Sequence, residues 1–224
     1  EARFGQGSLV GDLNTDGMLN AVYHLYGQQL FADFYEAPER AARLMEQVGD
    51  LIVEVALSVR RRSNSTSVSV NSMVKHLPGS VFLHSNCSVQ MISPASYRKM
   101  QFPIEKRMAE RLEPFGVHHC GNNMHRFAAD YARLGVCFCD VGWGSDIALC
   151  RQALPDAFLN MRLNPVRMLQ CTPDEIAADT EHLLSEAGPL EQVGVCCINM
   201  DHGTPDDNIF AMFEVVERYR RMGA

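Results

Sequence analysis

Apolar and polar positions along the chain follow two alternating patterns. Across residues 38–61 apolar side chains recur every three or four positions, which predicts a helix with one buried face. The same pattern predicts further helices at residues 94–112, 122–134, 145–153, 173–187 and around 209–219. Short apolar runs lie between these helices and predict buried strands at residues 81–85, 116–120, 136–141, 157–163 and 193–199.

Five successive strand-then-helix units are typical of parallel strands with helices packed outside them. The chain contains neither a GxGxxG sequence nor a phosphate-loop motif, which favours a (β/α)8 TIM barrel over a doubly wound sheet. A full barrel takes about 250 residues. We therefore expect one α/β barrel domain over residues 1–224, incomplete at its N-terminus unless the first third supplies the early units. An unpaired strand edge would then be covered by dimerisation or by further N-terminal residues.

Composition narrows the class of protein. A net charge of −7 and a pI near 5.6 argue against a nucleic-acid partner, because such proteins usually present a basic face. Eight cysteines without a regular disulfide spacing are typical of a reduced, intracellular chain. No apolar stretch approaches the roughly 20 residues of a membrane span, and no signal peptide is recognisable. The sequence thus predicts a cytoplasmic protein without membrane contact.

The segment GVHHCG carries the clearest candidate chemistry. Side chains alternate along a strand, so His118 and Cys120 point to one face and His119 to the other. Imidazole nitrogen and thiolate sulfur both bind zinc, although a cysteine also packs as a small apolar side chain. In the last predicted strand, the same alternation sets Cys197 and Cys196 on opposite faces. His118, Cys120 and Cys197 therefore form a candidate three-ligand site with an open fourth position.

Six short motifs occur in a characteristic order. They are Ala37-Pro38-Glu39, Ile92-Ser93-Pro94 with Tyr97 and Pro103, HxCG at 118–121, Leu163-Asn164-Pro165, CTPDEI at 171–176 and TPDDNI at 204–209. Together they resemble the uroporphyrinogen decarboxylase superfamily, over residues from about 5 to 219. The resemblance implies a barrel whose active site lies at the C-terminal ends of its strands.

Within that superfamily the chain most resembles the cobalamin-dependent methyltransferases. The resemblance implies that His118, Cys120 and a late cysteine hold a zinc ion that activates a thiol. It also implies a corrinoid protein as partner and a small-molecule methyl acceptor or donor. The late cysteine corresponds to Cys197 one residue out of step, which leaves Cys196 as a rival.

The sequence leaves two alternative functions open. Residues 199–203, NMDHG, resemble the NLGHG segment of the metal-free porphyrinogen decarboxylases, with Asp201 in place of glycine. The aspartate essential to those enzymes has no match in this chain. The other alternative is a truncated homologue that binds a ligand or partner without turnover.

Three further residues are candidates for contact with the metal ligands or the substrate. Asp140 ends a predicted strand and is a candidate catalytic residue that is expected to orient His118 or bind substrate, or else to cap the next loop. Arg162 is expected either to face the barrel and hold an anionic group or to leave the strand into solvent. Trp143 lies in a Gly-Trp-Gly loop, where it would stack on a flat ligand or serve as a buried anchor.

Three polar residues at strand ends complete the set of candidates. His84 and Asn86 end the first predicted strand and are expected to line the pocket. His202 lies in the last loop and is expected to hydrogen-bond the substrate or the protein in a catalytic or structural role.

Overall fold

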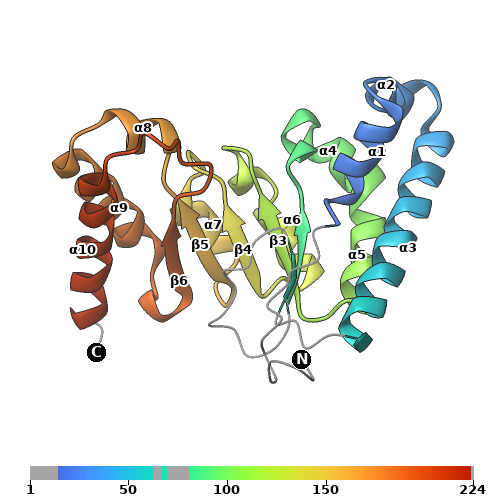
Figure 1. The fold of residues 1–224 in the computed structure, drawn as a ribbon. Helices are drawn as coiled ribbons and strands as arrows, with labels where there is room; N and C mark the ends of the chain where they lie inside the picture. The colour runs from blue at the N-terminus through green and yellow to red at the C-terminus, as the bar shows by residue number, and fades with distance from the viewer. Residues whose placement is uncertain (1–14, 63–66, 70–80, 223–224) are drawn as a thin grey trace, which may run out of the picture.

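The computed structural model describes residues 15–62, 67–69 and 81–222. Their strands form a parallel sheet in sequence order, from β1 at one edge to β6 at the other (Figure 1). The strands are β1 Ser67–Ser69, β2 Val81–Ser85, β3 Phe115–His119, β4 Phe138–Val141, β5 Phe158–Arg162 and β6 Val193–Cys196. Parallel strands in sequence order, joined from β2 onward through helices, confirm the predicted α/β barrel type of fold.

Helices cover one face of this sheet and extend beyond it at both ends (Figure 1). Neighbouring helices pack side by side, in the series α3, α5, α6, α7, α9 and α10. The α-helices are α1 Met18–Tyr26, α2 Gln29–Glu36, α3 Pro38–Arg62, α4 Pro94–Ser96, α5 Phe102–Arg111, α6 Ala128–Leu134, α7 Ile147–Ala153, α8 Pro165–Gln170, α9 Pro173–Ala187 and α10 Asp206–Met222. None of these helices is long and apolar enough to cross a membrane.

The strands have two faces of different composition. Paired positions of neighbouring parallel strands share a face, and Leu83, Gly116, Phe138 and Phe158 are paired in series across β2 to β5. We call this face, opposite the helices, the inner face. A Cβ atom on Gly116 would lie 2.9 Å from the carbonyl oxygen of Phe138, so the strands approach too closely there for a larger residue. The intervening residues Phe82, Val117, Cys139 and Leu159 are buried in the core against the helices.

Most of the predicted helices and strands are present, with several local differences. Helices α1, α2 and α8 lie where none is predicted, and within the predicted helix 122–134 a 3-10 turn, Met124–Arg126, precedes α6. Residues 94–112 are not one helix, because the π-helical turn Tyr97–Gln101 separates α4 from α5. Pro103 lacks the N–H that would bond back to this turn, which is a physical reason for the interruption. The last strand ends at Cys196 rather than at residue 199, and Asn199 has a left-handed φ of 60° that an extended strand cannot contain. Residues 67–69, where no strand is predicted, form β1.

Candidate metal centre

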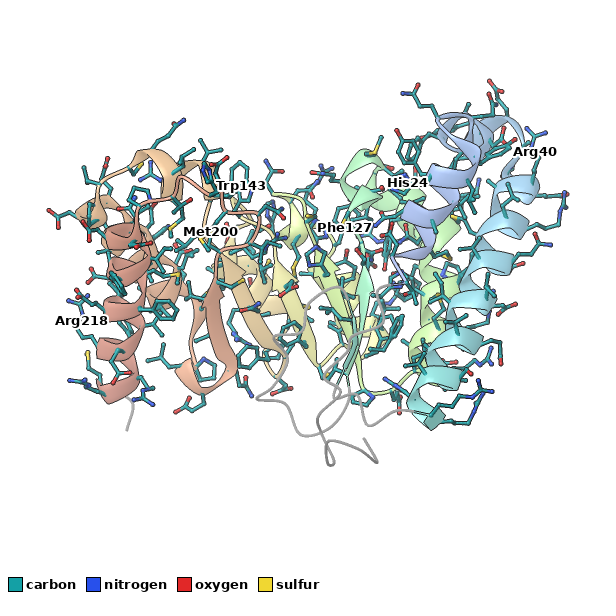
Figure 2. All side chains as sticks on the ribbon, viewed as in Figure 1. His24, Arg40, Phe127, Trp143, Met200 and Arg218 are labelled. Atoms are coloured by element: carbon teal, nitrogen blue, oxygen red, sulfur yellow. The ribbon has the colours of Figure 1, made fainter. Side chains whose placement is uncertain are left out.

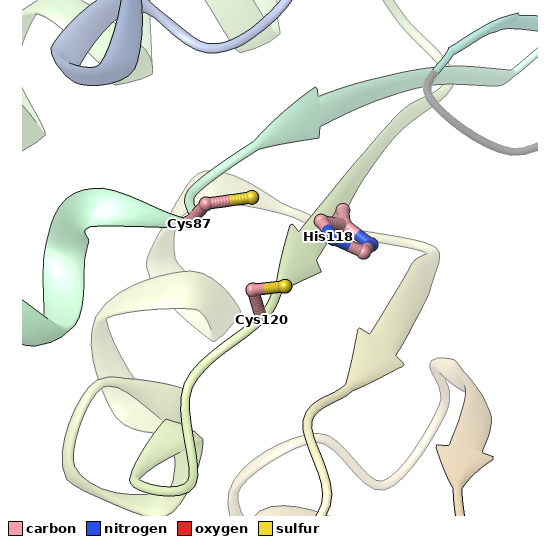
Figure 3. Close-up of side chains that lie close together, drawn as sticks. All are labelled: Cys87, His118 and Cys120. Carbon is pink, nitrogen blue, oxygen red and sulfur yellow. The ribbon is translucent and has the colours of Figure 1, made fainter. Parts of the chain in front are cut away.

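The candidate site lies at the C-terminal ends of β2 and β3. His118 is the fourth residue of β3, and Cys120 follows the strand directly. Ser85 is paired with His118 in the parallel register, so Cys87, two residues further along, comes level with Cys120. The ligand atoms of Cys87, His118 and Cys120 all lie within 4.8 Å of one another (Figure 3). Two sulfur atoms and one imidazole nitrogen thus converge on one point.

A carboxylate supports the histidine from behind. Asp140 is fully buried, and one of its carboxylate oxygens lies 2.8 Å from Nδ1 of His118. Its other oxygen accepts a hydrogen bond of 2.7 Å from the side-chain amide of Asn160, and the same amide lies 3.3 Å from Sγ of Cys196. This contact is the one expected if Asp140 orients His118. Nδ1 is occupied, so Nε2 is the nitrogen left for a ligand.

The surroundings favour a charged pair at this site when no metal is bound. Hydrogen bonds from Cys87 and then from His118 lower the pKa of the Cys120 thiol, against the effect of burial. Burial by itself would lower the pKa of His118, but the hydrogen bonds to Asp140 and Cys120 outweigh it and raise the pKa to about 9. The bond to Cys120 and burial raise the pKa of Cys87. Cys120 is thus held as a thiolate, the form that binds metal ions.

Arg162 extends from the end of β5 toward the same sulfur atom. Its side chain is buried, at 5% exposure, and its Nη1 donates to Sγ of Cys120 over 3.5 Å. The Nε atom has no hydrogen-bond partner among the residues that the structure describes. Arg162 therefore faces the inner side of the sheet, as one of the two sequence interpretations predicts, and does not leave the strand into solvent.

A cavity of about 660 Å³ adjoins Arg162. Trp143 borders it and is 42% exposed, so it is not the buried anchor of the alternative interpretation. Trp143 and Met200 lie on loops at the same edge of the sheet, where strands β4 and β6 end (Figure 2). Further lining residues are His125, Ser145, Asn164, Arg167 and Asp179. Arg167 is already paired with Asp179, whereas Arg162 is the cation closest to the candidate ligands.

The two late cysteines lie on the faces opposite to those expected. Cys196 ends β6 and contacts Asn160 on the inner face, in the network that reaches His118. Cys197 packs beyond the strand in a cluster with Leu163 and Met168, on the side of the helices. The prediction that Cys197 shares a face with His118 is therefore wrong by one residue, because the register between β5 and β6 pairs Arg162 with Cys196.

His84 and Asn86 do not line a pocket at this site, contrary to the prediction. His84 is fully buried on the helix-covered face, where its Nε2 lies 3.2 Å from a carboxylate oxygen of Glu105. Asn86 is equally buried and hydrogen-bonds with Gln101 and Tyr131. The inner positions of β2 are odd-numbered, as Leu83 and its partners show, so these two even-numbered side chains turn toward the helices.

His202 is not brought to the candidate centre in this structure. Its side chain is fully exposed, at 102%, and lies 3.4 Å from the neighbouring carboxylate of Asp201. Cys87 is the residue that sequence reasoning missed. Its position two residues after a predicted strand was a usable signal, but it gains meaning only when β2 is paired with β3.

Comparison with known proteins agrees with this architecture. The family model described as uroporphyrinogen decarboxylase (URO-D) matches residues 21–219, and the chain belongs to this family. A solved structure, a methyltransferase from Methanosarcina mazei, shares the fold with a TM-score of 0.69 and 14% sequence identity. The match covers 92% of this chain and 57% of that one, so the chain spans little more than half the length of that methyltransferase. The search of curated proteins gave no match.

Proposed function

We propose that the protein is a zinc-dependent methyltransferase that moves a methyl group between a corrinoid on a partner protein and a small thiol. The observation that carries the proposal is the convergence of Cys87, His118 and Cys120 within 4.8 Å. Membership of the uroporphyrinogen decarboxylase family and the likeness in fold to a methyltransferase support it.

The donor set fits zinc. Zinc in catalytic sites takes three protein ligands of nitrogen or sulfur and keeps one position for substrate. Cys87, His118 and Cys120 supply that set, and Asp140 hydrogen-bonds the histidine as carboxylates do behind zinc-bound imidazoles. Cys196 stays a rival for the third ligand, because it lies on the same face and joins the Asp140 network through Asn160.

The residues of the chain have separate tasks in this proposal. When bound, zinc would stabilise the thiolate of a substrate, which is the form that attacks an electrophilic methyl group. Asp140 holds the ring of His118 so that Nε2 faces the sulfur atoms. The guanidinium of Arg162 balances negative charge beside Cys120 and lines the cavity, where it would attract an anionic group of the substrate. Trp143 offers a flat surface at the mouth of the cavity.

The first test is the zinc affinity of the purified protein, measured by competition with a chromophoric chelator. We expect about one zinc per chain. The zinc affinity should fall by more than about a hundredfold in Cys87→Ser and Cys120→Ser, which exceeds the loss typical of replacing a residue that only hydrogen-bonds a metal ligand. Cys197→Ser is the matched control and should retain zinc, because Cys197 packs toward the helices. If Cys196→Ser rather than Cys87→Ser loses zinc, the third ligand is Cys196.

Activity is tested with methylcobalamin as a stand-in for the corrinoid protein. The zinc-loaded chain should transfer the methyl group of methylcobalamin to a small thiol. The reaction is monitored by the change in cobalamin absorbance. The Cys120→Ser variant should be inactive, whereas Cys197→Ser should be active. A wild-type chain that binds no zinc after reconstitution would contradict the proposal and favour the metal-free decarboxylase or a non-catalytic ligand-binding protein.

A further inference from the structure

One phenol hydroxyl lies behind both strand ends that carry the candidate ligands. Tyr131 on α6 is fully buried on the helix-covered side of the sheet. Its hydroxyl accepts a hydrogen bond of 3.4 Å from the amide of Asn86, the residue before Cys87. The same hydroxyl lies 2.9 Å from Nδ1 of His119, the residue between His118 and Cys120.

The hydrogen-bond roles around this hydroxyl are fixed by their neighbours. The side-chain oxygen of Asn123 lies 2.9 Å from Nε2 of His119 and can only accept, so Nε2 carries the proton. Nδ1 of His119 is then an acceptor, and the hydroxyl of Tyr131 donates to it while accepting from Asn86. Each hydrogen-bonding group in this short network therefore has a partner that matches it.

The strand ends are also joined to each other through this region. The backbone N–H of Asn86 donates to the carbonyl of His118 over 2.7 Å, and the side-chain oxygen of Asn86 accepts from Gln101 over 2.8 Å. The ring of Tyr131 is packed against Tyr97 and Phe127, with centroids 6.0 and 6.4 Å away. The hydroxyl is thus attached to a ring whose position is set by its aromatic neighbours.

We infer that Tyr131 is a positioning residue for the metal centre, and this inference rests on the site of the proposed function. Side chains alternate along a strand, so Asn86 and His119 point to the helices while the adjacent sulfur atoms reach the inner face (Figure 3). By bonding both neighbours, the hydroxyl sets the separation of Cys87 from Cys120. Tyr131 touches neither metal nor substrate and acts through these two residues.

The test removes a single oxygen atom in the variant Tyr131→Phe, which keeps the ring. Tyr97→Phe is the matched control, because it removes an equally buried hydroxyl that bonds neither Asn86 nor His119; its partner Glu105 reaches Asn86 only through Gln101. We expect zinc affinity to fall about 10–100-fold in Tyr131→Phe, the range typical of residues that orient metal ligands. We expect no such fall in Tyr97→Phe, although thermal unfolding should show both variants somewhat less stable.

Two further measurements separate positioning from general loosening of the structure. The spectrum of the cobalt-substituted protein reports the geometry of the sulfur ligands and should change in Tyr131→Phe but not in Tyr97→Phe. Phenylarsine oxide condenses with two close thiols, forming two arsenic–sulfur bonds and releasing water, and therefore probes the sulfur pair without zinc. The affinity of the protein for phenylarsine oxide should also fall about tenfold or more in Tyr131→Phe. Cys87→Ser, which lacks one sulfur atom of the pair, gives the baseline affinity.

The outcomes distinguish this inference from the proposed function. If wild type binds zinc and the two tyrosine variants do not differ, the role of Tyr131 is refuted and the metal site stands. If wild type binds the arsenical but no zinc, the metal proposal fails, and the arsenical affinities alone decide whether Tyr131 sets the spacing. If wild type binds neither, the sulfur atoms do not converge and both ideas are overturned.

Discussion

Arg162 is the residue that most restricts which substrates the proposed site would bind. A buried guanidinium that contacts Cys120 and lines the neighbouring cavity is a strong site for a carboxylate or a sulfonate. Lysine would not replace it well, because an ammonium cannot form two parallel hydrogen bonds to one anionic group. The proposal therefore predicts a thiol substrate that carries a negative charge.

Replacing Arg162 with glutamine tests this prediction. Hydrogen bonds to charged groups are worth about 1.5–3 kcal/mol, which corresponds to roughly a 10–100-fold rise in KM for a carboxylate-bearing thiol. A neutral thiol of similar size should show little change, and zinc content should be retained. Arg167→Gln is the control, because Arg167 lines the same cavity but is paired with Asp179. Equal losses for charged and neutral thiols would contradict the anion-binding role.

Among the secondary-structure elements, helix α5 contacts strand β2 through a buried pair of ionisable side chains. Glu105 of α5 and His84 of β2 are both fully buried and lie 3.2 Å apart. Burial raises the pKa of Glu105, but hydrogen bonds from His84, Tyr97 and Gln101 outweigh it, and the pKa is lowered from 4.5. The carboxylate is therefore charged in the folded protein and stabilises the contact between this helix and the sheet.

The variant Glu105→Gln should lower the free energy of unfolding by roughly 1–3 kcal/mol near pH 7, because the buried donors of Tyr97 and Gln101 lose a charged acceptor. The pKa of Glu105 is lower in the folded than in the unfolded state. Its contribution is thus fully present above pH 4.5 and is lost as the pH falls below that value. In urea unfolding, the difference in free energy of unfolding between wild type and Glu105→Gln should therefore shrink as the pH falls below 4.5. Glu110→Gln, on the exposed side of α5, should change little; a silent Glu105→Gln would contradict the argument.

At the scale of the whole molecule, the sheet is open where a closed barrel would continue. Among the described strands, β1 and β6 are the edges, and β6 is only partly buried. Apolar residues of β6 and α10, among them Val193, Val195 and Tyr219, line a groove of about 290 Å³ beside that edge. Unpaired edges of this kind pair with other strands unless they are covered.

We therefore predict that this chain associates with a second copy in solution. Sedimentation equilibrium should give twice the 25.0 kDa mass of the chain at micromolar concentrations and should show dissociation on dilution. Dimerisation would also make the denaturation midpoint depend on protein concentration. A monomer at all concentrations, with cooperative unfolding, would contradict the prediction and mean that the edge needs no such cover.

The sequence by itself determined the longer helices, most of the strands and the family. Apolar periodicity reflects local geometry, 3.6 residues per helical turn and two per strand repeat, and it needs no knowledge of distant residues. The start of α9 is an example, since the local sequence Thr172 to Glu175 forms a capping box with both of its hydrogen bonds. The pair His118 and Cys120 was also readable, because both belong to one short predicted strand, residues 116–120, of which the structure has Cys120 directly after β3.

Only the tertiary structure decided which residues meet. Cys87 reaches Cys120 because β2 and β3 pair in a register that sets Ser85 opposite His118, and no local pattern specifies that register. The same reason explains why Cys196 rather than Cys197 shares the inner face, and why His84 turns to Glu105 instead of the cavity. Alternation gives two faces to every strand, but which face is buried under helices depends on the packing of the whole sheet.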